Sequence, residues 1–150
     1  MLKPKNILED DWGIKVNFQF PNGREFKMYN KHNFKGSSIY NKLHGVLRAA
    51  MLGQGRGCHL YIAGHLHTGS IMQTPLDESG ETVWVCRAKG YKWWDSYAHE
   101  RLNFEFDAHA LGFESIFVVV DPDAKSEQSF VTCFSDPEEG VEFLNWKRSK

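Results

Sequence analysis

The chain has 150 residues, of which 41% are hydrophobic and 14% aromatic, and its formal net charge at pH 7 is −1. This composition is typical of a folded globular domain and excludes a disordered chain. The near-neutral charge argues against a strong nonspecific grip on nucleic acid or on an anionic membrane, although it leaves room for a local basic patch.

The cysteine content and the hydropathy pattern bound the class of protein further. Three cysteines without a CxxC pair indicate neither a disulfide framework nor a zinc ribbon, so we expect reduced, mostly buried thiols. The first residues lack the apolar core of a signal peptide, and no stretch approaches the ~18 apolar residues of a membrane helix. We therefore expect a soluble, cytoplasmic protein that does not enter a membrane.

The first third of the chain predicts a hairpin followed by a helix. Residues 14–20 alternate between apolar and polar side chains, and residues 24–29 do so again. Asn22-Gly23 between them is a strong hairpin turn signal. Residues 38–52 then carry apolar side chains at helical spacing and are followed by Gly53, which predicts the main helix.

The rest of the chain predicts mostly strands. They are expected at residues 59–64, 70–73, 81–88, 115–120 and 129–134. Residues 89–102 are interpreted as an irregular loop with a helical turn, and residues 138–146 as a short helix or a last strand. One helix among about seven strands, with many hairpin signals, predicts a single layered α/β domain over residues 1–150 whose strands are mostly antiparallel.

Residues 60–70, LYIAGHLHTGS, place two histidines where a strand ends. The apolar run stops at Gly64, and His65 and His67 follow with one residue between them. Residues two apart on an extended segment project from the same side, and neutral imidazole is the commonest metal ligand. With seven histidines in the chain, an HxH pattern arises by chance in roughly one such sequence in four. The pattern alone therefore leaves open both a metal site and ordinary hydrogen-bonded histidines.

The same motif resembles a known family. AGHLHT is similar to GHxH, the last metal-binding motif of the calcineurin-like metallophosphoesterases. Residues 30–48, NKHNFKGSSIYNKLHGVLR, resemble the segment in which that family places a lone histidine ligand before a helix, and His32 matches it. Residues 90–104 loosely resemble phage-encoded members. The resemblance spans about residues 30–100.

This resemblance implies a fold and an activity. The fold would be the strand-rich C-terminal half of an αββα sandwich. The activity would be phosphoester hydrolysis, as a phosphodiesterase, nuclease or phosphatase, with two divalent ions (Mn, Fe, Zn or Ni) that activate a hydroxide between them. By position, His32 and His65 would bind one ion and His67 the other.

Earlier motifs of that family are missing here. The sequence contains no GD and no GNH, and its one DxH, Asp107-Ala108-His109, follows GHxH instead of preceding it and is interpreted as accidental. Three imidazoles without carboxylates would hold two dications poorly. We therefore expect a partial domain whose N-terminal half, with DxH, GD and GNH, comes from another polypeptide and docks on an exposed sheet edge. The alternative is an inactive remnant, or a subunit that binds metal or a partner.

Two other metal or hydrolase families fit less well. A cupin needs a glutamate three or four residues after HxH, where Ser70 and Ile71 stand, and a histidine-triad hydrolase needs a third alternating histidine, where Gly69 stands.

Secondary site residues are expected on the helix and after the strand at 81–88. His44 and Arg48 are candidates for a phosphate contact, with a solvated helix face as the alternative. Lys89, Tyr91 and Lys92 interleave cations with rings and could contact a nucleic acid substrate, whereas the alternative we prefer is a loop whose aromatics complete the core.

Overall fold

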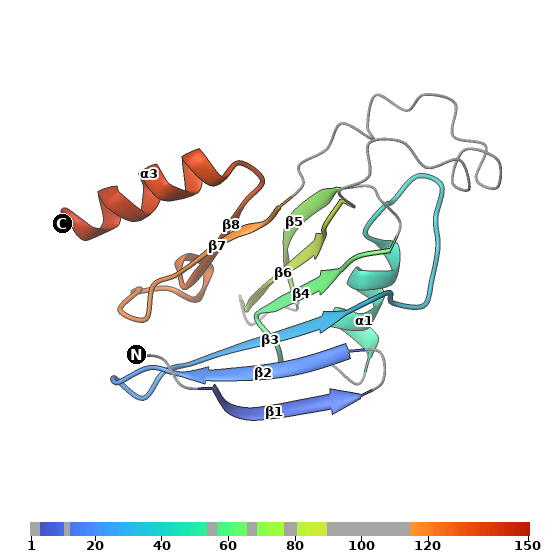
Figure 1. Ribbon diagram of the computed structural model, residues 1–150, viewed down its shortest axis with the longest axis horizontal. Coiled ribbons are helices and arrows are strands. Elements are labelled where there is room, and N and C mark those ends of the chain that lie inside the picture. The colour runs from blue at the N-terminus through green and yellow to red at the C-terminus, as the bar shows by residue number, and fades with distance from the viewer. Residues whose placement is uncertain (1–3, 11–12, 54–56, 66–68, 77–80, 90–114) are drawn as a thin grey trace.

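The computed structural model describes residues 4–10, 13–53, 57–65, 69–76, 81–89 and 115–150. They form a six-stranded sheet in the order β1-β2-β3-β4-β6-β5 and a separate two-stranded sheet, β7-β8 (Figure 1). The strands are β1 (Pro4–Asp10), β2 (Gly13–Gln19), β3 (Glu25–Lys31), β4 (Leu60–Ala63), β5 (Ser70–Pro75), β6 (Thr82–Arg87), β7 (Phe117–Val120) and β8 (Val131–Phe134). The helices are α1 (His44–Leu52), the 3-10 turn η2 (Glu127–Ser129) and α3 (Pro137–Arg148). The α/β class predicted from the sequence is thus confirmed.

The N-terminal part of the large sheet is the predicted antiparallel hairpin, extended by β1. The turn between β2 and β3 is closed by the N–H of Phe20, which donates to the carbonyl oxygen of Arg24 at 2.8 Å. Gly23 lies there at φ 86°, a left-handed conformation that glycine adopts without steric cost. Phe18 and Phe26, opposite each other in register, stack with ring centroids 5.9 Å apart.

The centre of the large sheet is parallel, which the sequence did not reveal. β3 pairs with β4 in parallel, with α1 in the crossover between them, and β4 pairs with β6 in parallel. The other four pairings are antiparallel, so antiparallel pairs are the majority, as expected. Parallel pairing joins segments far apart in the chain and leaves no local turn signal, which is why only the hairpins were predictable.

The two faces of the large sheet are covered by different elements (Figure 1). On one face, Val46 and Ala50 of α1 pack with Tyr61 and Val85 of the sheet. On the other face, the β7–β8 hairpin packs its own apolar side chains against Leu60 of β4. Since Leu60 and Tyr61 are 0% and 1% exposed, β4 is buried on both faces, as its apolar run predicts.

Helix α3 packs on the outer side of the β7–β8 hairpin. Phe143 of α3 lies 5.2 Å, centroid to centroid, from Phe134 of β8. Gly140 lies so close to Phe117 of β7 that an added Cβ would be 2.2 Å from its ring. The layers therefore follow one another as helix, large sheet, hairpin and helix.

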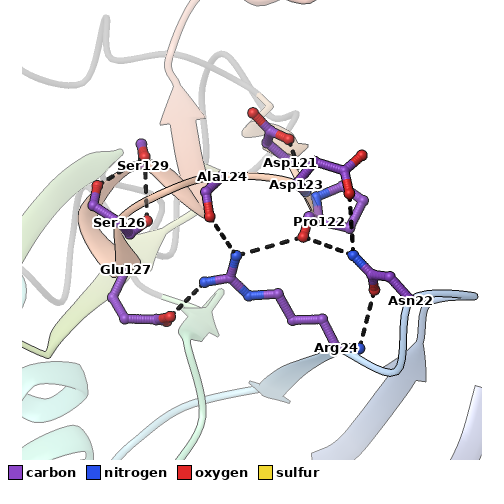
Figure 2. A network of polar contacts seen from close by, with 9 residues as sticks. All are labelled: Asn22, Arg24, Asp121, Pro122, Asp123, Ala124, Ser126, Glu127 and Ser129. Atoms are coloured by element: carbon purple, nitrogen blue, oxygen red, sulfur yellow. Dashed lines mark hydrogen bonds and ion pairs between the residues drawn. The ribbon is translucent and has the colours of Figure 1, made fainter.

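A polar clamp joins the β2–β3 turn to the loop after β7 (Figure 2). Arg24 Nη1 donates to the carbonyl oxygen of Ala124 at 2.8 Å, and its other terminal nitrogen pairs with the carboxylate of Glu127. The Asn22 amide donates to the carbonyl oxygen of Pro122 at 2.9 Å. The guanidinium also lies 4.0 Å from the ring centroid of Phe130, which adds a cation–π contact. The clamp holds the hairpin layer on the large sheet.

The expected main helix at residues 38–52 is corrected in two respects. It begins only at His44, because Ser38 Oγ accepts the N–H groups of Tyr40 and Asn41 and so stabilises a turn instead of a helix. It is also shorter than α3, with nine residues against twelve. Residues 138–146, expected as a short helix or a last strand, lie within the helix α3. Asp136 is its N-cap and accepts the N–H of Glu138.

The three cysteines are buried thiols, as the sequence predicts. Cys58, Cys86 and Cys133 are all free and buried. None of the helices in the described ranges is long and apolar enough to cross a membrane.

Candidate metal centre at the carboxyl ends of β3 and β4

The adjacent carboxyl ends of β3 and β4 bring two of the predicted ligands together. Lys31 and Ala63, the last residues of the two strands, are in register. Just beyond them, the N–H of Gly64 donates to the carbonyl oxygen of His32 at 3.2 Å. The carboxyl ends of parallel strands are the usual place for ligand sites in open α/β sheets.

The imidazoles of His32 and His65 meet edge to face at this end of the sheet. Their ring centroids are 4.6 Å apart and their planes are inclined by 66°. Both residues are exposed, so a ligand from solvent can reach them. The third predicted ligand, His67, lies outside the described residues, as does the Asp107–His109 tripeptide. The pairing of His32 with His65 is therefore the part of the predicted set that can be seen.

His65 is held in an unusual backbone conformation. Its φ of 72° makes it the one non-glycine residue with positive φ in the described part of the chain. The left-handed region costs an L-residue about 1–2 kcal/mol, and such strain concentrates at functional sites. An added Cβ on Gly64 would meet only the carbonyl oxygen of His32 among the described atoms, at an ordinary 3.8 Å. The backbone constraint at this turn thus falls on the histidine and not on the glycine.

Arg87 holds the turn at Gly64 and His65, here called the histidine loop, a role that the sequence did not suggest. Arg87 is the last residue of β6 and is 1% exposed. Nη1 donates to the carbonyl oxygen of Gly64 at 2.9 Å, and Nε donates to the carbonyl oxygen of Lys42 at 3.0 Å. Burial lowers the pKa of the guanidinium. One buried cation therefore links the histidine loop to the segment that enters α1. A charged residue at the end of an otherwise apolar strand, VWVCR, is the signal that points to it.

The secondary candidates, His44 and Arg48, both belong to α1. His44 is the first residue of α1, and its Cδ2 would be 3.2 Å from a Cβ added at Gly36, so the imidazole covers that glycine. Arg48 is exposed one turn further along. In the described part of the chain, neither side chain forms a hydrogen bond or a ring contact with His32 or His65.

The proposed substrate loop can be placed only at its first residue. Lys89 lies two residues after the end of β6 and is half-buried, and Tyr91 and Lys92 are outside the described residues.

His59 has a structural role. Its Nδ1 accepts the N–H of Lys27 at 2.9 Å. The ring stacks on Phe26 and meets the edge of Phe130, with centroids 6.1 and 5.0 Å away. Burial, as the largest effect, lowers the pKa of His59 and favours the neutral imidazole that this hydrogen bond needs. His59 is thus part of the packing between the sheet and the hairpin.

The histidine pair fits half of a metal site. With metal–nitrogen bonds of about 2.0–2.1 Å, two imidazoles that share one ion place their ring centres roughly 5 Å apart, close to the observed spacing. Imidazole nitrogen suits zinc, nickel and iron. In the described ranges, however, no group of three or more His, Cys, Asp or Glu residues is arranged to hold an ion. A metal ion bound here would need ligands beyond these two imidazoles.

Comparison of the chain with protein-family models, curated proteins and solved structures found no significant match to any of them.

Proposed function

We propose that this chain supplies part of a dinuclear, metal-dependent phosphoester hydrolase centre. In this proposal His32 and His65 are nitrogen ligands of one divalent ion, and His67 is a ligand of the second. The observation that supports it is the 4.6 Å spacing of the His32 and His65 rings at the carboxyl ends of two parallel strands. The resemblance of AGHLHT to the GHxH motif supplies the reaction class, hydrolysis of a phosphodiester or a phosphomonoester. Bound ions would acidify the attacking water and offset the charge that develops on the phosphoryl oxygens.

Carboxylate ligands from another polypeptide would complete the centre. Dinuclear sites need negatively charged oxygen donors to balance four positive charges, and the described residues offer no carboxylate beside the histidine pair. The partner would carry the missing DxH, GD and GNH motifs. The edge strands of the large sheet, β1 and β5, are the places where such a partner would extend the sheet.

Metal binding by the chain alone is the first test. Titration of the purified chain with Zn²⁺, Ni²⁺ or Mn²⁺ in a calorimeter should show one weak site. His32→Ala and His65→Ala should each abolish that site. His44→Gln is the matched control, because it removes an exposed imidazole that does not touch the pair. Equal metal affinity in all four proteins would overturn the assignment of the ligands.

Hydrolysis with a partner is the second test. The chain, with and without a polypeptide that carries the DxH, GD and GNH motifs, is assayed in manganese with a chromogenic phosphodiester. We expect turnover only in the mixture, and its loss with His65→Ala or His67→Ala. Metal binding without turnover in any mixture would instead support the alternative, a metal-binding subunit without catalytic activity.

A further inference from the structure

Positive charge is concentrated in the part of the sequence that builds the candidate site. The chain has 19 aspartates and glutamates, and none of them falls between residues 26 and 76. The same segment contains six basic residues: Lys27, Lys31, Lys35, Lys42, Arg48 and Arg56. It spans nearly all of β3, the loop to α1, α1 itself, β4 and β5. A chain of net charge −1 thus has one strongly basic region, and that region contains the histidine pair.

The loop between β3 and α1 also presents two large apolar side chains to solvent. Tyr40 is 98% exposed and Ile39 is 87% exposed, the highest values among the large hydrophobic residues in the described ranges. Ser38 Oγ accepts the N–H groups of Tyr40 and Asn41 at 3.3 and 3.2 Å. Because these bonds fix the turn, the tyrosine ring is presented from an ordered backbone.

This loop and the turn that carries His65 are joined through Arg87. Arg87 binds the carbonyl oxygen of Lys42, two residues after Tyr40, and that of Gly64, immediately before His65. These bonds and the reach of the chain limit the separation of the Tyr40 and His65 Cα atoms to at most roughly 20 Å. A ligand chain bound at the histidines could therefore continue over the loop.

We propose that the segment 35–42 is a binding element for single-stranded nucleic acid, with a base stacked on Tyr40 and beside Ile39, and with phosphates near Lys35, Lys42 and Arg48. The proposal rests on the proposed function and gives its substrate class, a single-stranded polynucleotide. Aromatic rings flanked by cations are the usual means of binding single strands without sequence preference. A duplex keeps its bases stacked and out of reach of such a ring. An acidic peptide would satisfy the cations and leave the exposed ring unused.

Binding can be measured without metal or turnover. Fluorescence anisotropy with a labelled 12-nucleotide oligothymidylate, in EDTA, should show binding by the intact chain that weakens as salt is raised. Tyr40→Ala should weaken binding about tenfold or more, whereas Tyr40→Trp should retain it. Arg48→Gln and Lys35→Gln should each reduce the logarithmic salt slope by about 0.7. Lys125→Gln, an exposed lysine in the loop between β7 and η2, is the matched control and should change nothing.

Three results would overturn the proposal. They are equal affinity of Tyr40→Ala and the parent chain, tighter binding to duplex than to the single strand, and equal binding to polyglutamate and to the oligonucleotide. Circular dichroism of each variant excludes unfolding as the cause of lost binding. Because EDTA removes any metal, the oligonucleotide measurement does not depend on the metal site. A negative result in one of the two experiments therefore does not decide the other.

Discussion

The two ends of β3 place their charged and titratable side chains in different surroundings. At the amino end, Arg24 is paired with the carboxylate of Glu127 and with backbone carbonyl oxygens (Figure 2). Its guanidinium also lies over the ring of Phe130. Near the carboxyl end, the buried Arg87 binds two carbonyl oxygens. The exposed imidazoles of His32 and His65 meet there edge to face, and the backbone of His65 is strained. Both ends thus use an arginine to stabilise the fold. The second end also carries backbone strain at His65 that folding alone does not require, and such strain is typical of a binding site.

Arg87→Met should have the largest effect on stability. It removes two charge-assisted hydrogen bonds in a site that is 1% exposed, each worth about 1.5–3 kcal/mol. We expect the free energy of unfolding, measured by urea denaturation, to fall by about 3 kcal/mol or more. Arg48→Met, on the exposed face of α1, is the control and should cost less than about 0.5 kcal/mol. Similar midpoints for the two variants would show that Arg87 does not stabilise the two loops.

Arg24→Met should have a smaller effect at the opposite end. Its side chain is 22% exposed and that of Glu127 is 54% exposed, so solvent screens the ion pair. We expect a loss of about 1–2 kcal/mol, mainly from the bond to Ala124, and less than about 1 kcal/mol for Glu127→Gln. If Glu127→Gln costs as much as Arg24→Met, the ion pair and not the backbone contact holds the clamp.

His65→Gly should increase stability while it weakens metal binding. Glycine adopts a φ of 72° without the steric cost that a histidine bears, so the free energy of unfolding should rise by about 1 kcal/mol. His65→Ala retains the steric cost of the left-handed conformation, so its free energy of unfolding should not rise. Thermal unfolding and metal titration of the same samples measure both quantities. A His65→Gly variant that is less stable than the parent would mean that the ring contact with His32 outweighs the strain.

The pH dependence from His59 should be the smallest effect. Burial holds the pKa of His59 below its ordinary 6.5, so the unfolded chain takes up a proton on this residue before the folded chain does. Stability is therefore full above pH 6.5 and declines as the pH falls from there to the folded pKa. Urea unfolding between pH 7.5 and 5 should show this slope, and His59→Asn, which can still accept the Lys27 N–H, should reduce it. An unchanged slope in the variant would assign the pH dependence to another group.

The predictable part of the fold was the part encoded locally. Alternating side chains and the Asn22-Gly23 turn sufficed for β2 and β3. β1 was not predicted, because Pro4 and its polar and charged neighbours lack a strand pattern. The start of α1 was placed too early because Ser38 fits a helix cap in sequence, whereas its hydroxyl stabilises the preceding turn. The parallel pairings of β4 come from tertiary packing that no short window contains.

The contact between His32 and His65 could be predicted from a motif, whereas the hydrogen bonds of Arg87 beside it could not. His32 and His65 are 33 positions apart in the sequence, and only the similarity to GHxH-containing enzymes suggested that they meet. Arg87 was not among the predicted site residues. Its burial depends on β6 lying beside β4, which a linear pattern does not show.

The position of β4 has a consequence for the order of folding. β4 has a parallel partner on each side, and its neighbours β3 and β6 each belong to a hairpin that can form from contiguous sequence. Closing short loops is entropically cheaper than joining distant segments, so we expect both hairpins to form before β4 docks between them. In pulse-labelling hydrogen exchange, the amides of β4 should then gain protection last, and the histidine pair would assemble only in that final step.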